Sequence, residues 1–232
     1  MKLKQQKKGI ISRNDRKSFF LNFLAVVLGI AITFGGEAII SDRQEKKDLE
    51  KCLELVVSEL QSNREYLHYC DTLLRNEVNA AEFLIRYQND FTKAPKDTLN
   101  RVANTPLSLQ EVATYTDAFE LLKNSGVLTK IRDKNLALEI FQTYGAIGQT
   151  AKFLTLFYEH KLKYLEPALT DDVKSVLAED NVTAVGFWTE IVSTKEGKQF
   201  LREILRFLSA YDPSDTYSAM DSTIEAITEY CK

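Results

Sequence analysis

Residues 49–74 read LEKCLELVVSELQSNREYLHYCDTLL, and this stretch decides the fold class. Apolar residues recur in it at spacings of three and four, which is the period of one face of an α-helix. Four leucines stand seven residues apart on that face: Leu53, Leu60, Leu67 and Leu74. Neither glycine nor proline occurs between Glu37 and Ala94. Because nothing interrupts the pattern, it predicts one long helix in an all-α protein.

The leucine spacing fits both a homo-oligomeric zipper and burial against other helices of the same chain. In the register that places the leucines at one core position, the other core position includes Asn63 and Glu77. A glutamate repeated across a symmetric seam would bring like charges together. We therefore predict that this long stalk helix packs its leucine face, Leu53, Leu60, Leu67 and Leu74, against helices of its own chain.

Further helices are expected downstream, and together they predict a bundle. Residues 92–107 hold two of the four prolines and are typical of a loop with one helical turn. Residues 179–193, which contain the only tryptophan, have an ambiguous pattern. The expected helices cover 108–124 with a stop at Ser125-Gly126, a stretch from the cap Asp133 to just before Pro167, and then 171–178, 195–211 after the cap Thr194, and 214–231. Gly145 and Gly148 inside the long second helix suggest a kink or close helix packing.

A second apolar stretch, near the N-terminus, predicts a transmembrane helix. Residues 19–36 read FFLNFLAVVLGIAITFGG without a charge, and the apolar run continues past Glu37 to Ile40. Such a helix would be about 33 Å long, which matches a hydrocarbon core of about 30 Å. A cleaved signal peptide is the alternative, but the apolar run exceeds the usual length of a signal peptide's apolar core. We expect a basic cytoplasmic tail at 1–18, a span at 19–40 and an extracytoplasmic helical domain at 41–232.

The charges on either side of the span predict its orientation. Basic residues dominate before it, opposed by Asp15 alone, whereas the residues after it mix basic and acidic side chains. By the positive-inside rule the N-terminus is cytoplasmic and the domain is extracytoplasmic. The mildly acidic domain argues against nucleic-acid binding, while the tail suits a bilayer carrying anionic lipid.

Within the predicted span, small and polar residues recur at a spacing of four. A candidate helix-contact face is formed by Ala25, Gly29, Thr33 and Glu37. Small residues at this spacing let two helices approach closely. The alternative is that these residues have no partner, since glycine and alanine are common in single spans.

The sequence contains no signature of catalysis. The only histidines, His68 and His160, lie in no metal-binding motif, and no phosphate-binding loop or nucleophile motif occurs. We therefore expect no enzymatic activity, no cofactor and no metal site. Cys52 and Cys70 lie about 27 Å apart on one helix, too far to pair with each other. Either can meet Cys231, or all three are buried thiols.

The order of these features resembles a family of uncharacterised single-span helical membrane proteins that is common in Bacteroidetes, grouped as a domain of unknown function. The resemblance is carried by FLAVVLGIAITFGGEAII at 23–40, DRQEKKDLEKCLELVVSELQSNREYL at 42–67 and YTDAFELLKNSG at 115–126. It covers roughly residues 10–165, and it departs at the membrane exit, AIISDR. The resemblance implies an inner-membrane anchor and a periplasmic helical domain, with no activity attached.

Two functions compete at this point. The first is a non-enzymatic envelope protein whose helical domain has a structural role or binds a protein partner. The second is a sensor-type domain that binds a small ligand between helices. Because the cytoplasmic tail has only about 18 residues, such a sensor would need a separate partner for its output.

Overall fold

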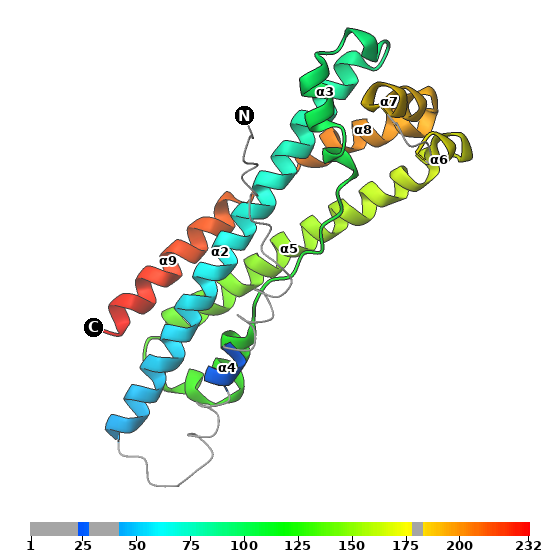
Figure 1. Cartoon of the computed structure of the whole chain (residues 1–232). Helices are drawn as coiled ribbons and strands as arrows, with labels where there is room; N and C mark the ends of the chain where they lie inside the picture. The colour runs from blue at the N-terminus through cyan, green and yellow to red at the C-terminus, as the bar shows by residue number, and fades with distance from the viewer. Residues whose placement is uncertain (1–22, 28–41, 178–182) are drawn as a thin grey trace, which may run out of the picture.

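The computed structural model describes residues 23–27, 42–177 and 183–232, and every regular element in these ranges is a helix (Figure 1). The α-helices are α2 (Asp42–Tyr87), α3 (Lys96–Val102), α4 (Asp117–Asn124), α5 (Lys134–Ala168), α6 (Asp171–Leu177), α7 (Ala184–Ser193), α8 (Lys195–Leu208) and α9 (Ser214–Tyr230). Short 3-10 turns occupy Phe91–Lys93, Thr105–Leu107 and Val127–Lys130. The prediction of an all-α fold is confirmed.

The core lies along the two longest helices, α2 and α5. Helices α8 and α9 each pack against both of them. Helices α3, α6 and α7 gather at one end of the bundle, and α4 lies toward the other (Figure 1). The four leucines of the predicted packing face are at most 1% exposed: Leu53, Leu60, Leu67 and Leu74. Helix α2 thus buries this face inside its own chain along most of its length.

Local signals set several helix ends where the sequence predicts them. The Asp133 carboxylate accepts hydrogen bonds from the backbone N–H groups of Asn135 and Leu136 at the start of α5. The Thr194 hydroxyl accepts one from the N–H of Gly197 at the start of α8. Gly126, just after α4, has a φ of 73°, the left-handed conformation that glycine adopts without a steric penalty. These three boundaries are confirmed.

The helix predicted over 108–124 is wrong in its first half. Residues 108–116 form no regular element, and the helix begins only at Asp117. This segment, which we call the strap, runs as a thin green ribbon along the bundle in Figure 1. Its sequence, SLQEVATYT, holds threonines and a valine that favour helix only weakly, so tertiary contacts decide its conformation.

Three smaller expectations also need correction. Residues 92–107 include a full helix, α3, rather than a single turn. Helix α5 runs through Pro167 to Ala168, because a proline in the last turn removes only one hydrogen bond. The ambiguous segment before Thr194 contains α7, whose Trp188 is fully buried and donates its indole N–H to the carbonyl of Ala103.

The two glycines inside α5 do not mark close packing within the chain. Gly145 and Gly148 are exposed, and a Cβ built on either would meet nothing within 4 Å. Gly197 is the opposite case, since a Cβ there would lie 1.9 Å from the Ile191 carbonyl oxygen. That glycine is required because the first turn of α8 lies directly against the end of α7.

Alanine substitutions at these glycines should therefore act in opposite directions. Gly145→Ala should raise the free energy of unfolding by about 0.5 to 1 kcal/mol, because alanine restricts the unfolded chain and favours helix. Gly197→Ala should lower it by about 2 kcal/mol, because the methyl group forces backbone apart. Urea unfolding followed by circular dichroism measures both changes. Equal effects at the two positions would contradict this account.

Most of the predicted span at 19–40 lies outside the described residues, as do Gly29, Thr33 and Glu37 of its candidate contact face. Ala25 is described and exposed. In the part of the chain that the structure describes, no helix has both the length and the apolar character needed to cross a bilayer.

Candidate functional site

Two buried polar bridges join α2 to α5. At one level the Tyr144 hydroxyl donates to the Glu59 carboxylate at 2.5 Å. At the other, the Lys161 ammonium lies 2.6 Å from a carboxylate oxygen of Glu77. The partners are 18 residues apart on α2 and 17 apart on α5, so each helix rises about 26 Å between the bridges. The two helices therefore run in the same direction at matched heights.

The strap fills the space between these bridges. Ser108 contacts the Glu77 bridge and Ala118 contacts the Glu59 bridge, ten residues later. Ten extended residues reach about 33 Å, which is enough to connect the two levels, whereas ten helical residues reach about 15 Å. A helix starting at Ser108 could not make both contacts. The spacing of the bridges thus explains why the predicted helix is extended before α4.

At the first of these bridges, that of Glu59 and Tyr144, a side chain of α2 caps the start of α4. Thr116, the residue before α4, makes no side-chain cap of its own. Instead the Glu59 carboxylate accepts hydrogen bonds from the backbone N–H groups of Ala118 and Phe119, at 2.8 and 3.2 Å. A carboxylate at a helix N-terminus accepts hydrogen bonds from the free N–H groups there, and its negative charge interacts favourably with the helix dipole. Burial raises the pKa of Glu59, and these hydrogen bonds oppose the rise.

Two α2 side chains hold the middle of the strap through its backbone. The Asn63 side-chain amide donates to the carbonyl of Tyr115 and accepts from the N–H of the same residue. The Tyr66 hydroxyl donates to the carbonyl of Glu111 and accepts from the N–H of Ala113. Because the contacts are to backbone groups, they fix the path of the strap without depending on its side chains.

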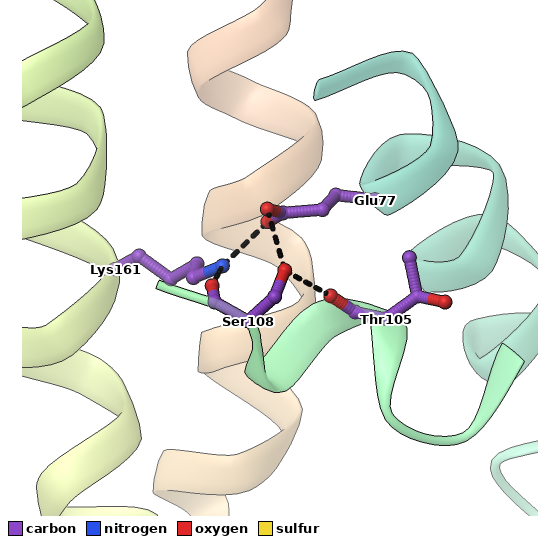
Figure 2. A network of polar contacts seen from close by, with 4 residues as sticks. All are labelled: Glu77, Thr105, Ser108 and Lys161. Carbon is purple, nitrogen blue, oxygen red and sulfur yellow. Dashed lines mark hydrogen bonds and ion pairs between the residues drawn. The ribbon is translucent and has the colours of Figure 1, made fainter. Parts of the chain in front are cut away.

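The second bridge, which we call the upper bridge, is the buried ion pair of Glu77 and Lys161. The strap residue Ser108 contacts both members of this pair. Figure 2 shows Lys161 reaching both Glu77 and the carbonyl oxygen of Ser108, while the Ser108 hydroxyl lies between Glu77 and the carbonyl of Thr105. Both charged side chains are 1% exposed. Burial raises the pKa of Glu77 and lowers that of Lys161, and their mutual attraction opposes both shifts. The close pairing holds the two groups as an ion pair.

A third buried acid, Asp71, ties α2 to the other side of the bundle. Its carboxylate accepts hydrogen bonds from the hydroxyls of Tyr211 and Tyr217. Burial, together with the neighbouring carboxylate, raises the pKa of both phenols. His68 stacks on Tyr217, and His160 contacts the Glu203 carboxylate at 3.1 Å. Both histidines thus contact groups that hold helices together.

One open groove lies beside the upper bridge, between α2 and the segment from α3 to Ser108. Its volume is about 730 Å³. Its floor includes the apolar side chains Leu73, Ala80, Phe83 and Val102. Its rim carries exposed polar side chains that make no hydrogen bond with another described residue: Asn76, Asn79, Arg101 and Asn104. The groove offers amide groups and one guanidinium to a small polar molecule.

The second open surface is the outward face of α5. Three large apolar side chains are exposed on it, Leu138 at 55%, Phe141 at 39% and Leu156 at 46%. Gly145 and Gly148 lie between them on the same face. The exposed positions from Leu138 to Leu156 carry one charge, that of Lys152. We call this surface, residues 138, 141, 145, 148, 152 and 156, the α5 face.

The predicted leucine face lies behind the strap network, in the core, and takes no part in an open site. The polar members of the network were not predicted as a site: Glu59, Asn63, Glu77 and Lys161. A signal exists for Asn63 and Glu77, which occupy core positions of the leucine register, whereas nothing in the sequence marks Glu59 or Lys161. Cys52, Cys70 and Cys231 are all free thiols. Burial, assisted by Asp48, raises the pKa of Cys52 to about 11, so this thiol stays protonated.

Phe23, in the helical residues 23–27, contacts the domain. It is partly buried against the core and lines a small cavity with Ser58, Glu59, Ser62 and Tyr115. A span beginning at residue 19 would hold Phe23 in the bilayer. This contact and the predicted span are thus two mutually exclusive placements of the same side chain.

Comparisons with known proteins give no relative for this chain. No protein-family model, no curated protein and no solved structure matches it.

Proposed function

We propose that this chain is a membrane-anchored envelope protein whose helical domain binds a protein partner through the α5 face. The observation that carries the proposal is the exposure of Leu138, Phe141 and Leu156 along one nearly uncharged helix face. Leu138 and Phe141 lie about one turn apart and form an exposed apolar pair of the kind that other proteins cover, and Leu156 lies about 22 Å farther along the helix. The two glycines between them allow another helix to approach the backbone closely.

The buried acids support a binding role over a catalytic one. Glu59, Asp71 and Glu77 each accept hydrogen bonds from groups that position the strap or the neighbouring helices. These carboxylates are therefore committed to holding the bundle in shape. A rigid bundle in turn holds the α5 face in one geometry, which lowers the entropic cost of binding.

The anchor is proposed from the sequence at 19–40, with the N-terminus in the cytoplasm and the domain in the periplasm. Inserting its 13 leucine, isoleucine, valine and phenylalanine residues gains on the order of 5 kcal/mol. The contact of Phe23 with the domain is worth about 1 to 2 kcal/mol, since one side chain is only partly buried. Where a bilayer is available, insertion should therefore displace Phe23 from the cavity that it lines with Ser58 and Tyr115.

Membrane fractionation tests the anchor. Membranes washed at alkaline pH should retain the full chain, whereas a Val27→Arg/Ile30→Arg variant should be released. An alkaline phosphatase fused after Lys51 should be active, because that enzyme matures only where disulfides form. Release of the unaltered chain, or an inactive phosphatase beside an active cytoplasmic reporter at the same site, would reject the anchor or its orientation.

Photo-crosslinking in cells tests the α5 face. A photoreactive amino acid at Leu138 or Leu156 should give adducts with a protein of defined mass. The same residue at Glu82, which is exposed on α2, is the matched control and should give none. Equal labelling at all three positions, or no adduct at 138 and 156, would show that this face binds no protein.

The groove between α2 and α3 favours a second candidate function, recognition of a small polar ligand. Its rim places Arg101 and three asparagines around an apolar floor, and none of these polar groups bonds to another described residue. Pockets of this size commonly combine an apolar lining with a few polar groups. Thermal-shift measurements with sugars and sugar acids test it, and any shift should disappear in an Arg101→Ala variant.

A further inference from the structure

We infer that residues 23–27 have two alternative sites, one on the domain and one in the bilayer, and that the site on the domain holds them before the chain enters the membrane. The inference rests on the proposed anchor at 19–40, because it describes the state that precedes insertion. Its basis is the helical turn at 23–27, which contacts the domain through Phe23. We call these residues the docking segment and their contact with the domain the docked state.

The docking segment contacts the domain through one side. Phe23 and Val27 stand four residues apart, about one helical turn, and both are half-buried. The Phe23 side chain packs against the hydrophobic core of the domain. Leu24 and Val26, in contrast, remain 37% and 50% exposed. The docked state therefore leaves apolar surface in water that a bilayer would cover.

The receiving site on the domain fits one aromatic ring. It is lined by Ser58, Glu59 and Ser62 of α2 and by Tyr115 at the end of the strap. The Ser62 hydroxyl donates to the carbonyl of Ser58, so it presents no unpaired donor to the ring. A space of about 10 Å³ remains beside Phe23, which is close to the smallest volume that holds one water molecule. The ring therefore fills this site almost completely.

The docked state and a spanning helix exclude each other by topology. Phe23 lies 17 positions before Ile40, the end of the proposed span, so a continuous helix places it about 26 Å from that end. In the proposed orientation, Phe23 lies near the cytoplasmic face of the bilayer, whereas Ser62 belongs to the domain on the opposite side. A chain that spans the bilayer cannot bring these two side chains together. The docked state therefore has to open before the chain inserts.

A cysteine pair that locks the docked state tests the inference. In a Cys231→Ser background, the full chain carrying Phe23→Cys/Ser62→Cys and synthesised without lipid should form an intramolecular disulfide on mild oxidation. Leu24→Cys/Ser62→Cys is the matched control and should give at least ten-fold less disulfide, because Leu24 is exposed. Equal yields from the two pairs would show that Phe23 has no preferred place on the domain, and the inference would fall.

Vesicles of phosphatidylethanolamine and phosphatidylglycerol then show whether docking opposes insertion. After an alkaline wash, the vesicles should retain the reduced Phe23→Cys/Ser62→Cys chain at least ten-fold better than the oxidised chain. Equal retention of the oxidised chain would overturn the inference, because a locked chain could then enter the bilayer. The proposed anchor fails separately: it is wrong if the disulfide forms but the reduced and the unaltered chains are both released. If the unaltered chain is retained and the disulfide does not form, the anchor stands and the docked state is rejected.

Discussion

Replacing Lys161 with alanine should lower the free energy of unfolding by about 3 to 5 kcal/mol, since it leaves the buried Glu77 carboxylate without its cation. The Ser108 carbonyl loses a donor at the same time. Chemical denaturation of the domain measures the change. Lys163→Ala is the matched control, because Lys163 is exposed on the same helix and should alter stability by less than about 0.5 kcal/mol.

The same site predicts a compensating double variant. Glu77→Leu/Lys161→Met replaces the ion pair with apolar side chains of similar size, and such replacements are often neutral or stabilising. We expect the double variant to lie within about 1 kcal/mol of the original chain. If it were as unstable as Lys161→Ala, the ion pair itself, rather than the avoidance of an unpaired charge, would hold the strap.

The pH dependence of Lys161→Ala has a definite sign. Burial raises the pKa of Glu77 above its usual 4.5, and in this variant no ammonium opposes the rise. A carboxyl with a raised pKa in the folded state contributes stability below its unfolded pKa, and that contribution is lost as the pH increases through the folded pKa. The penalty of the variant should therefore shrink as the pH is lowered from about 8 to about 5.

Leu60→Asp should unfold the domain or lower its stability by about 4 kcal/mol or more, because it removes a packed side chain and buries a charge. Leu60 is 0% exposed within the single chain. Gln61→Asp, at the exposed neighbouring position, introduces the same charge and should be nearly neutral. If Leu60→Asp stayed folded and only converted an oligomer to a monomer in light scattering, α2 would be a zipper.

The sequence predicts those features that depend on local periodicity and caps. The spacing of Leu53 to Leu74 predicts α2, and Asp133 and Thr194 predict the starts of α5 and α8. The strap fails this test because its extended form is set by Glu59, Asn63 and Glu77, whose contacts lie 31 to 60 residues away in the chain. The helix propensities of residues 108–116 do not reflect those contacts, so they cannot predict the extended conformation.

The candidate site likewise has parts that the sequence indicates and parts that only the folded chain reveals. Asn63 and Glu77 at core positions indicate buried polar partners, but the partners themselves, the Tyr115 backbone and Lys161, are brought there only by the folded chain. Lys161 looks like one more lysine of a charged helix until it lies beside Glu77. The α5 face, by contrast, depends on Gly145 and Gly148. From the sequence these glycines suggest a kink or close helix packing, but in the single chain both are exposed.

The strap can also be described as a ligand that is bound by the rest of its own chain. An extended segment held through its backbone by Asn63 and Tyr66 is bound as a peptide is bound, except that the peptide belongs to the same chain. Its effective concentration, set by short connections, is on the order of millimolar or higher. An intrinsic affinity in the millimolar range is then enough to keep the site filled. A free peptide of residues 108–116 would compete poorly, and a chain lacking those residues would become a receptor for them.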